Sequence, residues 1–273
     1  MRTFVIGDIH GHLTALQQVS KAANLRYDDL LITLGDYVDR GPDSKGVLDW
    51  IVQRSTSGKV IPLLGNHEQM MLAAHSDHDP DASELWMLNG GRMTLSSYGT
   101  NRKRGSIEDV PKQHWEFLER KCRLIYQTEQ HFFVHGGIDP ERGLEEQTEL
   151  SLLWTRFDDA VPHPSGKIMI CGHTPQASGK PRDLGYAICL DTCVFGGGWL
   201  TCLDLESKCY WQSDSRGEVR RGRLRTGSTS HGTGVKKVQR RDTRSDVWRR
   251  STGQLFLDTS PLGFPTAAET PRY

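Results

Sequence analysis

The chain has 273 residues with 34 basic and 34 acidic side chains, so its formal net charge is zero. Hydrophobic residues make up 36% and charged residues 25%, which is typical of a folded globular protein and excludes wholesale disorder. No apolar run approaches the roughly 18 residues of a membrane span. The first residues reach Asp8 before the apolar core of a signal peptide could form, so we expect a cytoplasmic protein.

Three short apolar segments near the N-terminus each end in glycine followed by polar residues, as buried strands do. These segments are residues 3–6, 30–34 and 60–64. A helical pattern follows each one, at residues 13–23, 44–54 and 68–74. Such alternation predicts a buried sheet flanked by helices. Ligands of such sheets bind at the carboxyl ends of the strands, where all three polar clusters fall.

The middle of the chain, residues 75–130, is more polar and has a helical pattern, which predicts a helical cap beside the site. Strand signals then return, and we expect a second sheet that brings histidines to the same edge as the first. The expected strands are residues 132–134, 168–170, 186–190, 199–205 and 209–212.

Five polar clusters carry the candidate chemistry. They are Gly7-Asp8-Ile9-His10-Gly11, Gly35-Asp36-Tyr37-Val38-Asp39-Arg40-Gly41, Gly65-Asn66-His67-Glu68, His135-Gly136-Gly137 and Gly172-His173-Thr174-Pro175. Oxygen and imidazole ligands without thiolates suit Mn²⁺, Fe or Zn²⁺. Two carboxylates, one amide and three histidines suffice for two metals if one carboxylate bridges them. Arg40 offers a planar fork to phosphoryl oxygens.

In this order, the five clusters resemble the PPP family of metal-dependent phosphoprotein phosphatases, in the calcineurin-like metallophosphoesterase superfamily. The resemblance covers residues 1–212. It implies an α/β fold in which two mixed β-sheets pack as a sandwich flanked by helices. It also implies a catalytic domain at residues 1–212, with the cap at 75–130 inside it, and leaves residues 213–273 as an extension.

The same resemblance implies two divalent metal ions, Mn²⁺ in the first place and Fe or Zn²⁺ otherwise. The first metal would be held by Asp8, His10 and Asp36. The second would be held by Asp36, which bridges both metals, and by Asn66, His135 and His173. A hydroxide that bridges the metals would attack phosphorus in line, without a phosphoenzyme.

The resemblance also implies how the substrate is handled. His67 would be the general acid that protonates the leaving alkoxide, and Asp39 would orient it. Arg40, Asn66 and Arg156 would bind phosphate oxygens, although Arg156 has only a short motif around it. Seven histidines lack such a context and are expected to be bystanders: His12, His75, His78, His114, His131, His163 and His231.

Departures from the family pattern narrow the range of expected substrates. Leu64 stands where eukaryotic members have arginine before Gly-Asn-His-Glu, and their Ser-Ala-Pro-Asn-Tyr segment is absent, so the chain resembles bacterial members. Asp39 is kept, whereas related diadenosine tetraphosphate hydrolases lack that aspartate, which favours cleavage of phosphomonoesters. We therefore expect a serine/threonine phosphoprotein phosphatase. The alternatives are a bis(5'-nucleosyl)-tetraphosphatase or other small-phosphoester hydrolase, and a catalytically silent binding module.

The zero net charge conceals an uneven distribution. Residues 216–250 contain 12 basic and three acidic side chains, a net charge of +9, so the remainder carries −9. Few apolar residues interrupt this segment, and we expect residues 213–273 to be a flexible extension. It is either a solvated tail or an arm that contacts a polyanion or an acidic protein.

Overall fold

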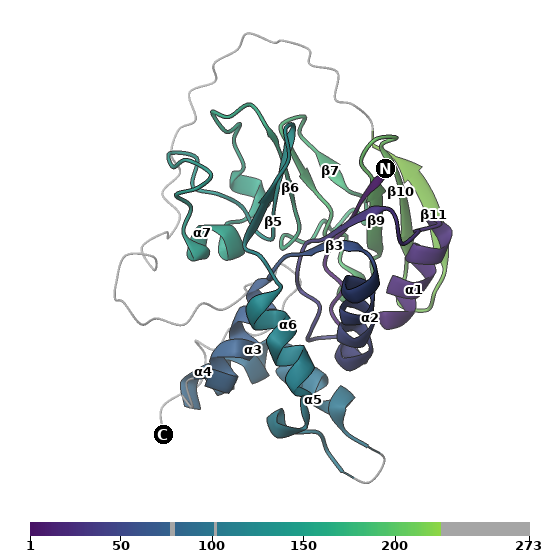
Figure 1. The fold of residues 1–273 in the computed structure, drawn as a ribbon, viewed down its shortest axis with the longest axis vertical. Helices are drawn as coiled ribbons and strands as arrows, with labels where there is room; N and C mark the ends of the chain where they lie inside the picture. The colour runs from purple at the N-terminus through teal and green to yellow at the C-terminus, as the bar shows by residue number, and fades with distance from the viewer. Residues whose placement is uncertain (77–79, 101–102, 225–273) are drawn as a thin grey trace.

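Two β-sheets face each other in a computed structural model that describes residues 1–76, 80–100 and 103–224 (Figure 1). The larger sheet has the order β11-β10-β9-β1-β2-β3 and the smaller the order β4-β5-β6-β8-β7. The strands of the larger sheet are β1 (Thr3–Ile6), β2 (Leu30–Thr33), β3 (Lys59–Pro62), β9 (Leu200–Asp204), β10 (Cys209–Ser213) and β11 (Val219–Arg223). Those of the smaller sheet are β4 (Ile125–Gln127), β5 (His131–Val134), β6 (Ile168–Cys171), β7 (Arg182–Asp183) and β8 (Ala187–Cys189).

The central strands are apolar throughout because both faces of each sheet are covered. Side chains alternate between the faces of a strand, so Val5 points between the sheets, where it packs in one cluster with Phe133 and Ile170. Phe4 and Ile6 point the other way and pack against helices. Phe132 lies in a third apolar cluster, on the outer face of the smaller sheet.

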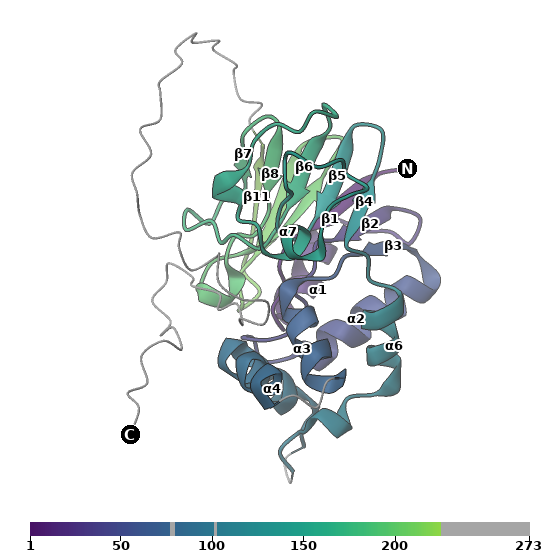
Figure 2. The same cartoon turned by 90° about the vertical axis from the view of Figure 1, so that its left-hand side faces the viewer.

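Helices cover the outer faces and extend beyond one end of the sandwich (Figure 2). The outer face of the larger sheet carries α1 (Leu13–Ala22) and α2 (Ser44–Ser57), and α7 (Glu149–Trp154) packs on the smaller sheet. The Asp43 side chain caps α2 by accepting from the Gly46 N–H. The remaining α-helices are α3 (Asn66–Ser76), α4 (Pro80–Trp86), α5 (Arg92–Tyr98) and α6 (Lys112–Arg120). We call the described residues between 80 and 120 the cap.

The expected sandwich of two mixed sheets is confirmed, but three expectations about its strands are wrong. Strands β9 and β10 belong to the first sheet, since β9 pairs antiparallel with β1 through Val5↔Leu203. The order of strands along the chain does not reveal such a return. Strand β4 lies inside the range 75–130 that was expected to be helical. Finally, the fold continues past residue 212, because β11 pairs with β10.

Strand β11 reads Val-Arg-Arg-Gly-Arg and forms the edge of its sheet. Edge strands tolerate charged side chains, which also block pairing with other molecules. This strand is therefore the part of the basic segment 216–250 that pairs into the sheet. The expectation of a flexible extension beyond residue 224 lies outside the described residues.

Candidate active site

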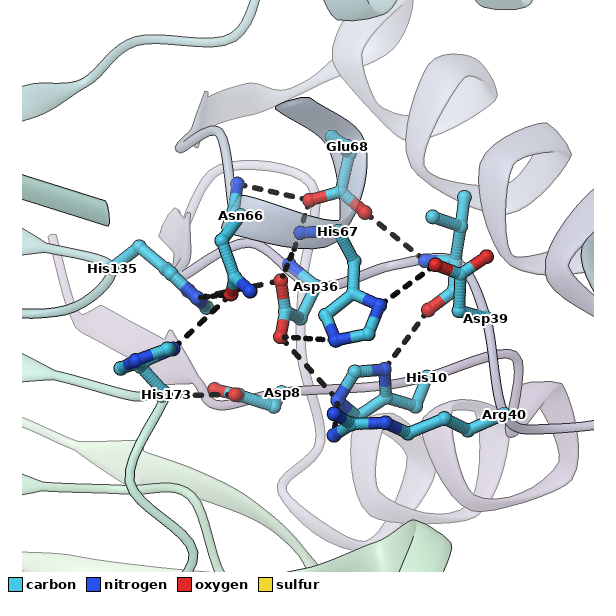
Figure 3. Close-up of polar contacts among 12 residues, drawn as sticks. Asp8, His10, Asp36, Asp39, Arg40, Asn66, His67, Glu68, His135 and His173 are labelled. Carbon is cyan, nitrogen blue, oxygen red and sulfur yellow. Dashed lines mark hydrogen bonds and ion pairs between the residues drawn. The ribbon is translucent and has the colours of Figure 1, made fainter. Parts of the chain in front are cut away.

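The polar clusters meet at one edge of the sandwich. Strands β1, β2 and β3 are mutually parallel, as are β5, β6 and β8. The turns that follow five of these strands carry the candidate residues, so segments up to 165 positions apart become neighbours, as in the hydrogen bond from the His173 N–H to Asp8 Oδ2. Figure 3 shows these side chains pointing toward one another.

Asp36 lies at the centre of this group. His10 Nε2 is 3.4 Å from its Oδ2, and His135 Nε2 is 3.3 Å from its Oδ1. Each carboxylate oxygen of Asp36 thus faces a different imidazole, as a bridging ligand requires. Two sets of three side chains place possible ligand atoms within 4.8 Å of one another: His10, Asp36 and His67, and Asp8, Asp36 and His135.

Asn66 and His173 complete the group. Asn66 Oδ1 lies 2.8 Å from His135 Nε2 and 3.1 Å from His173 Nδ1. Asp8 contributes Oδ1, a buried atom with no hydrogen-bond partner among the described residues. Burial, and then the negative charges of Asp191 and Asp36, raise the pKa of Asp8 well above its usual value.

The donor set fits divalent cations. The His135 Nδ1–H donates to the Leu34 carbonyl (2.8 Å), so Nε2 of the neutral ring presents a lone pair to the Asn66 Oδ1 and Asp36 Oδ1 acceptors. Acceptors that face one another repel, and a cation between them removes that repulsion. His10 has the same arrangement, because its Nδ1–H donates to the Val38 carbonyl (2.9 Å). Burial, and then the charge of Arg40, lower the pKa of His10 well below its usual value, which favours the neutral form that binds metals.

Beside the ligand group, His67 and Asp39 form a buried pair. His67 Nδ1 lies 2.7 Å from Asp39 Oδ2, and both side chains are completely buried. His67 Nε2, the other ring nitrogen, lies 4.0 Å from Asp36 Oδ2. The imidazole therefore connects Asp39 to the centre of the ligand group (Figure 3).

Two arginines act on the ligand group, one through a hydrogen bond and one through its charge. Arg40 donates through Nη1 to His10 Nε2 at 3.0 Å. Arg156 precedes the turn Phe157–Asp159. His173 has a pKa well below its usual value because of burial, and the charges of His135 and Arg156 lower it further. The positive charge of Arg156 therefore acts on His173, one of the candidate ligands.

Comparison with known proteins agrees with this geometry. The family model described as calcineurin-like phosphoesterase matches residues 1–200. The chain belongs to the calcineurin-like phosphoesterase family. It is therefore a metal-dependent phosphoester hydrolase, since this family uses a dinuclear divalent metal centre.

The relatives of this calcineurin-like phosphoesterase include both protein phosphatases and dinucleoside tetraphosphatases. Serine/threonine-protein phosphatase 1 of Salmonella typhimurium is 40% identical over 210 residues, covering 72% of this chain and 89% of that protein. This likeness confirms the expected resemblance to bacterial PPP members. A symmetrical bis(5'-nucleosyl)-tetraphosphatase of Photorhabdus laumondii is 38% identical, covering 79% of this chain and 98% of that protein.

A solved structure shares the fold. The cold-active protein-tyrosine phosphatase of a Shewanella species superposes with a TM-score of 0.54 and 18% identity, covering 81% of this chain and 80% of that one. No helix among the described residues is long and apolar enough to cross a membrane.

The cap supplies two residues of the site whose roles the sequence did not predict. Trp86 lies in the range 75–130 that was expected to form the cap, and its Nε1–H donates to Asp39 Oδ1 (3.0 Å) and Oδ2 (3.1 Å). Thr94 donates through Oγ1 to Asp39 Oδ1 (2.6 Å) and accepts from the Asp39 N–H (2.8 Å). Burial raises the pKa of Asp39 to about 7, while the hydrogen bonds from Thr94 and Trp86 act in the opposite direction.

Glu68 is the third unpredicted member, although it stands in the motif beside His67. Its carboxylate accepts from the N–H groups of Asp36 (2.8 Å), Tyr37 (2.7 Å), Val38 (3.1 Å) and Gly65 (2.9 Å). Burial, and then the charge of Asp36, raise its pKa to about 8. Glu68 thus fixes the turn that carries Asp36, and its complete burial was the property that the sequence did not show.

The turns that carry the site are conformationally strained. Five candidate residues adopt positive φ: His10, Asp36, Asp39, Arg40 and His173. Each such residue costs on the order of 1–3 kcal/mol, and strain of this kind gathers at functional sites. The close packing also requires glycine, since a Cβ on Gly41 would lie 1.9 Å from the His10 carbonyl oxygen.

The two sets of three side chains divide differently from the sequence expectation. We expected Asp8 and His10 to share one metal, but Asp8 groups with His135, and His10 groups with His67. All six expected ligands lie together, and the division between the two metals stays a prediction.

Proposed function

We propose that this calcineurin-like phosphoesterase is a phosphomonoester hydrolase that acts as a serine/threonine phosphoprotein phosphatase. The observation that carries the proposal is the buried His67–Asp39 pair, which provides an oriented acid beside the ligand group. The 40% identical phosphatase of Salmonella typhimurium supports the same substrate class.

We assign six residues to two divalent ions, for which Mn²⁺ is our choice because the ligands are oxygen and imidazole atoms. The ligands are Asp8, His10, Asp36, Asn66, His135 and His173. When bound, such ions lower the pKa of water to supply the nucleophile and neutralise charge on the phosphoryl group. The Leu34 and Val38 carbonyls keep two of the imidazoles in the ligating tautomer.

Three side chains are assigned to the phosphate. Arg40 and Arg156 offer planar donors of the kind that match phosphoryl oxygens. Asn66 directs Oδ1 at two imidazoles, whereas its buried Nδ2 has no hydrogen-bond partner among the described residues and suits a phosphate oxygen.

His67 is assigned the final proton transfer. In its protonated, imidazolium form His67 keeps the Nδ1–H on Asp39 and donates the proton of Nε2, on the Asp36 side, to the leaving oxygen, which leaves a neutral imidazole. A serine alkoxide is a strong base and leaves only when protonated. A nucleotide phosphate is a far weaker base, so a buried His–Asp pair contributes most to monoester cleavage.

Cleavage of dinucleoside polyphosphates is the second candidate, because the Photorhabdus laumondii tetraphosphatase is 38% identical. The test compares turnover of a phosphoserine peptide and of diadenosine tetraphosphate by the full chain with Mn²⁺. We expect turnover of the peptide to exceed that of the tetraphosphate. Tetraphosphate cleavage without peptide cleavage would reject the proposal, and failure to hydrolyse even p-nitrophenyl phosphate would support a silent binding module.

We also propose that the basic segment 216–250 contacts a polyanion or an acidic protein. Support comes from its net charge of +9. Within the described residues, Arg216 pairs with Asp214 and Glu218, and Arg220 stacks on Trp199. The residues from 225 onward lie outside the described part of the chain. The cytoplasmic location expected from the sequence stays a prediction.

A further inference from the structure

Phe195 lies in a short, firmly hydrogen-bonded turn between β8 and β9, next to the ligand group. The turn Val194–Gly196 follows Cys193, whose N–H donates to Asp191 Oδ1 (2.9 Å). The Gly198 N–H closes the turn on the Cys193 carbonyl (2.8 Å). Phe195 itself is half-buried.

The ring of Phe195 contacts two residues of the site. The guanidinium carbon of Arg40 lies over the ring, 4.2 Å from its centroid. The imidazole of His10 meets the ring edge to face, with centroids 4.9 Å apart and planes at 82°. Phe195 therefore packs against both the phosphate-binding arginine and a candidate metal ligand.

The main chain of Arg40 is already fixed, so only its side chain has freedom. Arg40 has φ of 66°. A Cβ on Gly90 of the cap would lie 2.7 Å from the Arg40 nitrogen, which shows how closely the cap backbone packs against it. The arginine side chain retains many rotamers unless a neighbour restricts them, and ordering it costs up to about 2 kcal/mol of entropy.

We propose that Phe195 is a positioning residue that holds the Arg40 guanidinium ready for the phosphate. This inference rests on the proposed role of Arg40 in phosphate binding. Stacking uses the face of the guanidinium, whereas hydrogen bonds to phosphate lie in its plane. The stacking on Phe195 therefore does not compete with phosphate. The hydrogen bond from Arg40 to His10 Nε2 cannot hold the guanidinium in the same way, because a metal ion bound at Nε2 would compete with it.

The test measures binding of inorganic phosphate to the Mn²⁺-loaded full chain by calorimetry. Phe195→Leu removes the π-face, and Phe195→Tyr retains it. Arg40→Ala, alone and combined with Phe195→Leu, completes a double-mutant cycle. Tyr27→Leu is the matched control, because it removes an exposed aromatic ring beneath Arg54 near the amino end of β2, the end opposite to the turn that carries Asp36.

Phe195→Leu is expected to weaken phosphate binding about fivefold to thirtyfold, the range of a partly desolvated cation–π contact. Phe195→Tyr and Tyr27→Leu should stay within about twofold of the wild type. The leucine substitution should change nothing further in the Arg40→Ala background. Metal content and melting temperature, measured alongside, should be unchanged in every variant. If Phe195→Leu proves poorly folded, Phe195→Met takes its place as a second variant without a π-face.

Two other outcomes separate the inference from the function on which it rests. If Arg40→Ala weakens phosphate binding and Phe195→Leu does not, or if the two losses simply add, the positioning role is rejected alone. If Arg40→Ala leaves phosphate binding unchanged, the proposed role of Arg40 is wrong, and the positioning role fails with it.

Discussion

The Nδ1 atom of His67 lies 2.7 Å from Oδ2 of Asp39, with both side chains fully buried. Asp39 can accept the Nδ1–H only while His67 keeps its Nε2 toward Asp36. The pair therefore fixes the direction of the imidazole, so that the Nε2–H of its protonated form faces the centre of the ligand group. A buried pair of this kind suits an acid that must deliver one proton at one place.

Replacing this acid should reveal which leaving groups depend on it. His67→Asn should lower kcat on a phosphoserine peptide about 10²–10⁴-fold, the usual contribution of general acid catalysis. The loss on p-nitrophenyl phosphate should be much smaller, because nitrophenolate leaves without a proton. Steady-state kinetics on both substrates, with metal analysis of the same samples, measures this difference. If the variant loses its metals instead, His67 is a ligand, as its grouping with His10 and Asp36 allows.

Thr94 should affect catalysis by holding Asp39 in place, and not by contacting the substrate. Thr94→Val removes the hydrogen bond to Asp39 Oδ1 and leaves the Asp39 N–H with only Ser44 Oγ at 3.1 Å. We expect kcat on the phosphoserine peptide to fall roughly 10–100-fold, as for other residues that orient catalytic groups. Stability should fall by about 1–3 kcal/mol, because a buried polar group loses its partner.

Thr94→Ser is the matched control, since it keeps the hydroxyl. Kinetics with both leaving groups, and urea unfolding, compare the two variants. Equal losses of kcat on both substrates would show that Thr94 does not act through the acid.

Much of the site could be predicted from short motifs, because glycine-bounded polar clusters after apolar strands fix which residues reach the sheet edge. Thr94 could not be found in this way. It lies 55 positions from Asp39, and only the packing of α5 against the site brings the two together. Glu68 was visible in its motif, but its role depends on burial and on four backbone donors. Likewise, the antiparallel return of β9 onto β1 depends on tertiary packing and not on local pattern.

Glu68 should prove structural for the turn that carries Asp36. In Glu68→Gln, an NH₂ group replaces one carboxylate oxygen and faces two of the four backbone donors. Each buried donor left without an acceptor costs about 1–3 kcal/mol. The urea midpoint of the Mn²⁺-loaded protein should fall, and Mn²⁺ should be released at lower chelator concentration.

Glu149→Gln provides the control, because Glu149 is an exposed carboxylate that accepts from Gln69. Glu149→Gln should leave both the urea midpoint and the chelator concentration that releases Mn²⁺ unchanged. If Glu68→Gln matched it in midpoint and metal release, the four backbone hydrogen bonds would contribute little to holding Asp36.

Two truncations separate the role of the last strand, β11, from that of the basic residues after position 224. A chain ending at residue 213 lacks β11, together with its pairing to β10 and the stacking of Arg220 on Trp199. It should melt roughly 5 °C below a chain ending at residue 224, on the scale of about 2–4 °C for each kcal/mol in domains of this size.

The chain ending at 224 retains four of the 12 basic residues of segment 216–250. Its affinity for heparin should therefore be weaker than that of the full chain, with a shallower dependence on salt. If the full chain and the chain ending at residue 224 bound heparin with equal affinity and equal salt dependence, the polyanion contact would be rejected. If the chains ending at residues 213 and 224 had equal melting temperatures, β11 would add nothing to the stability of the sheet.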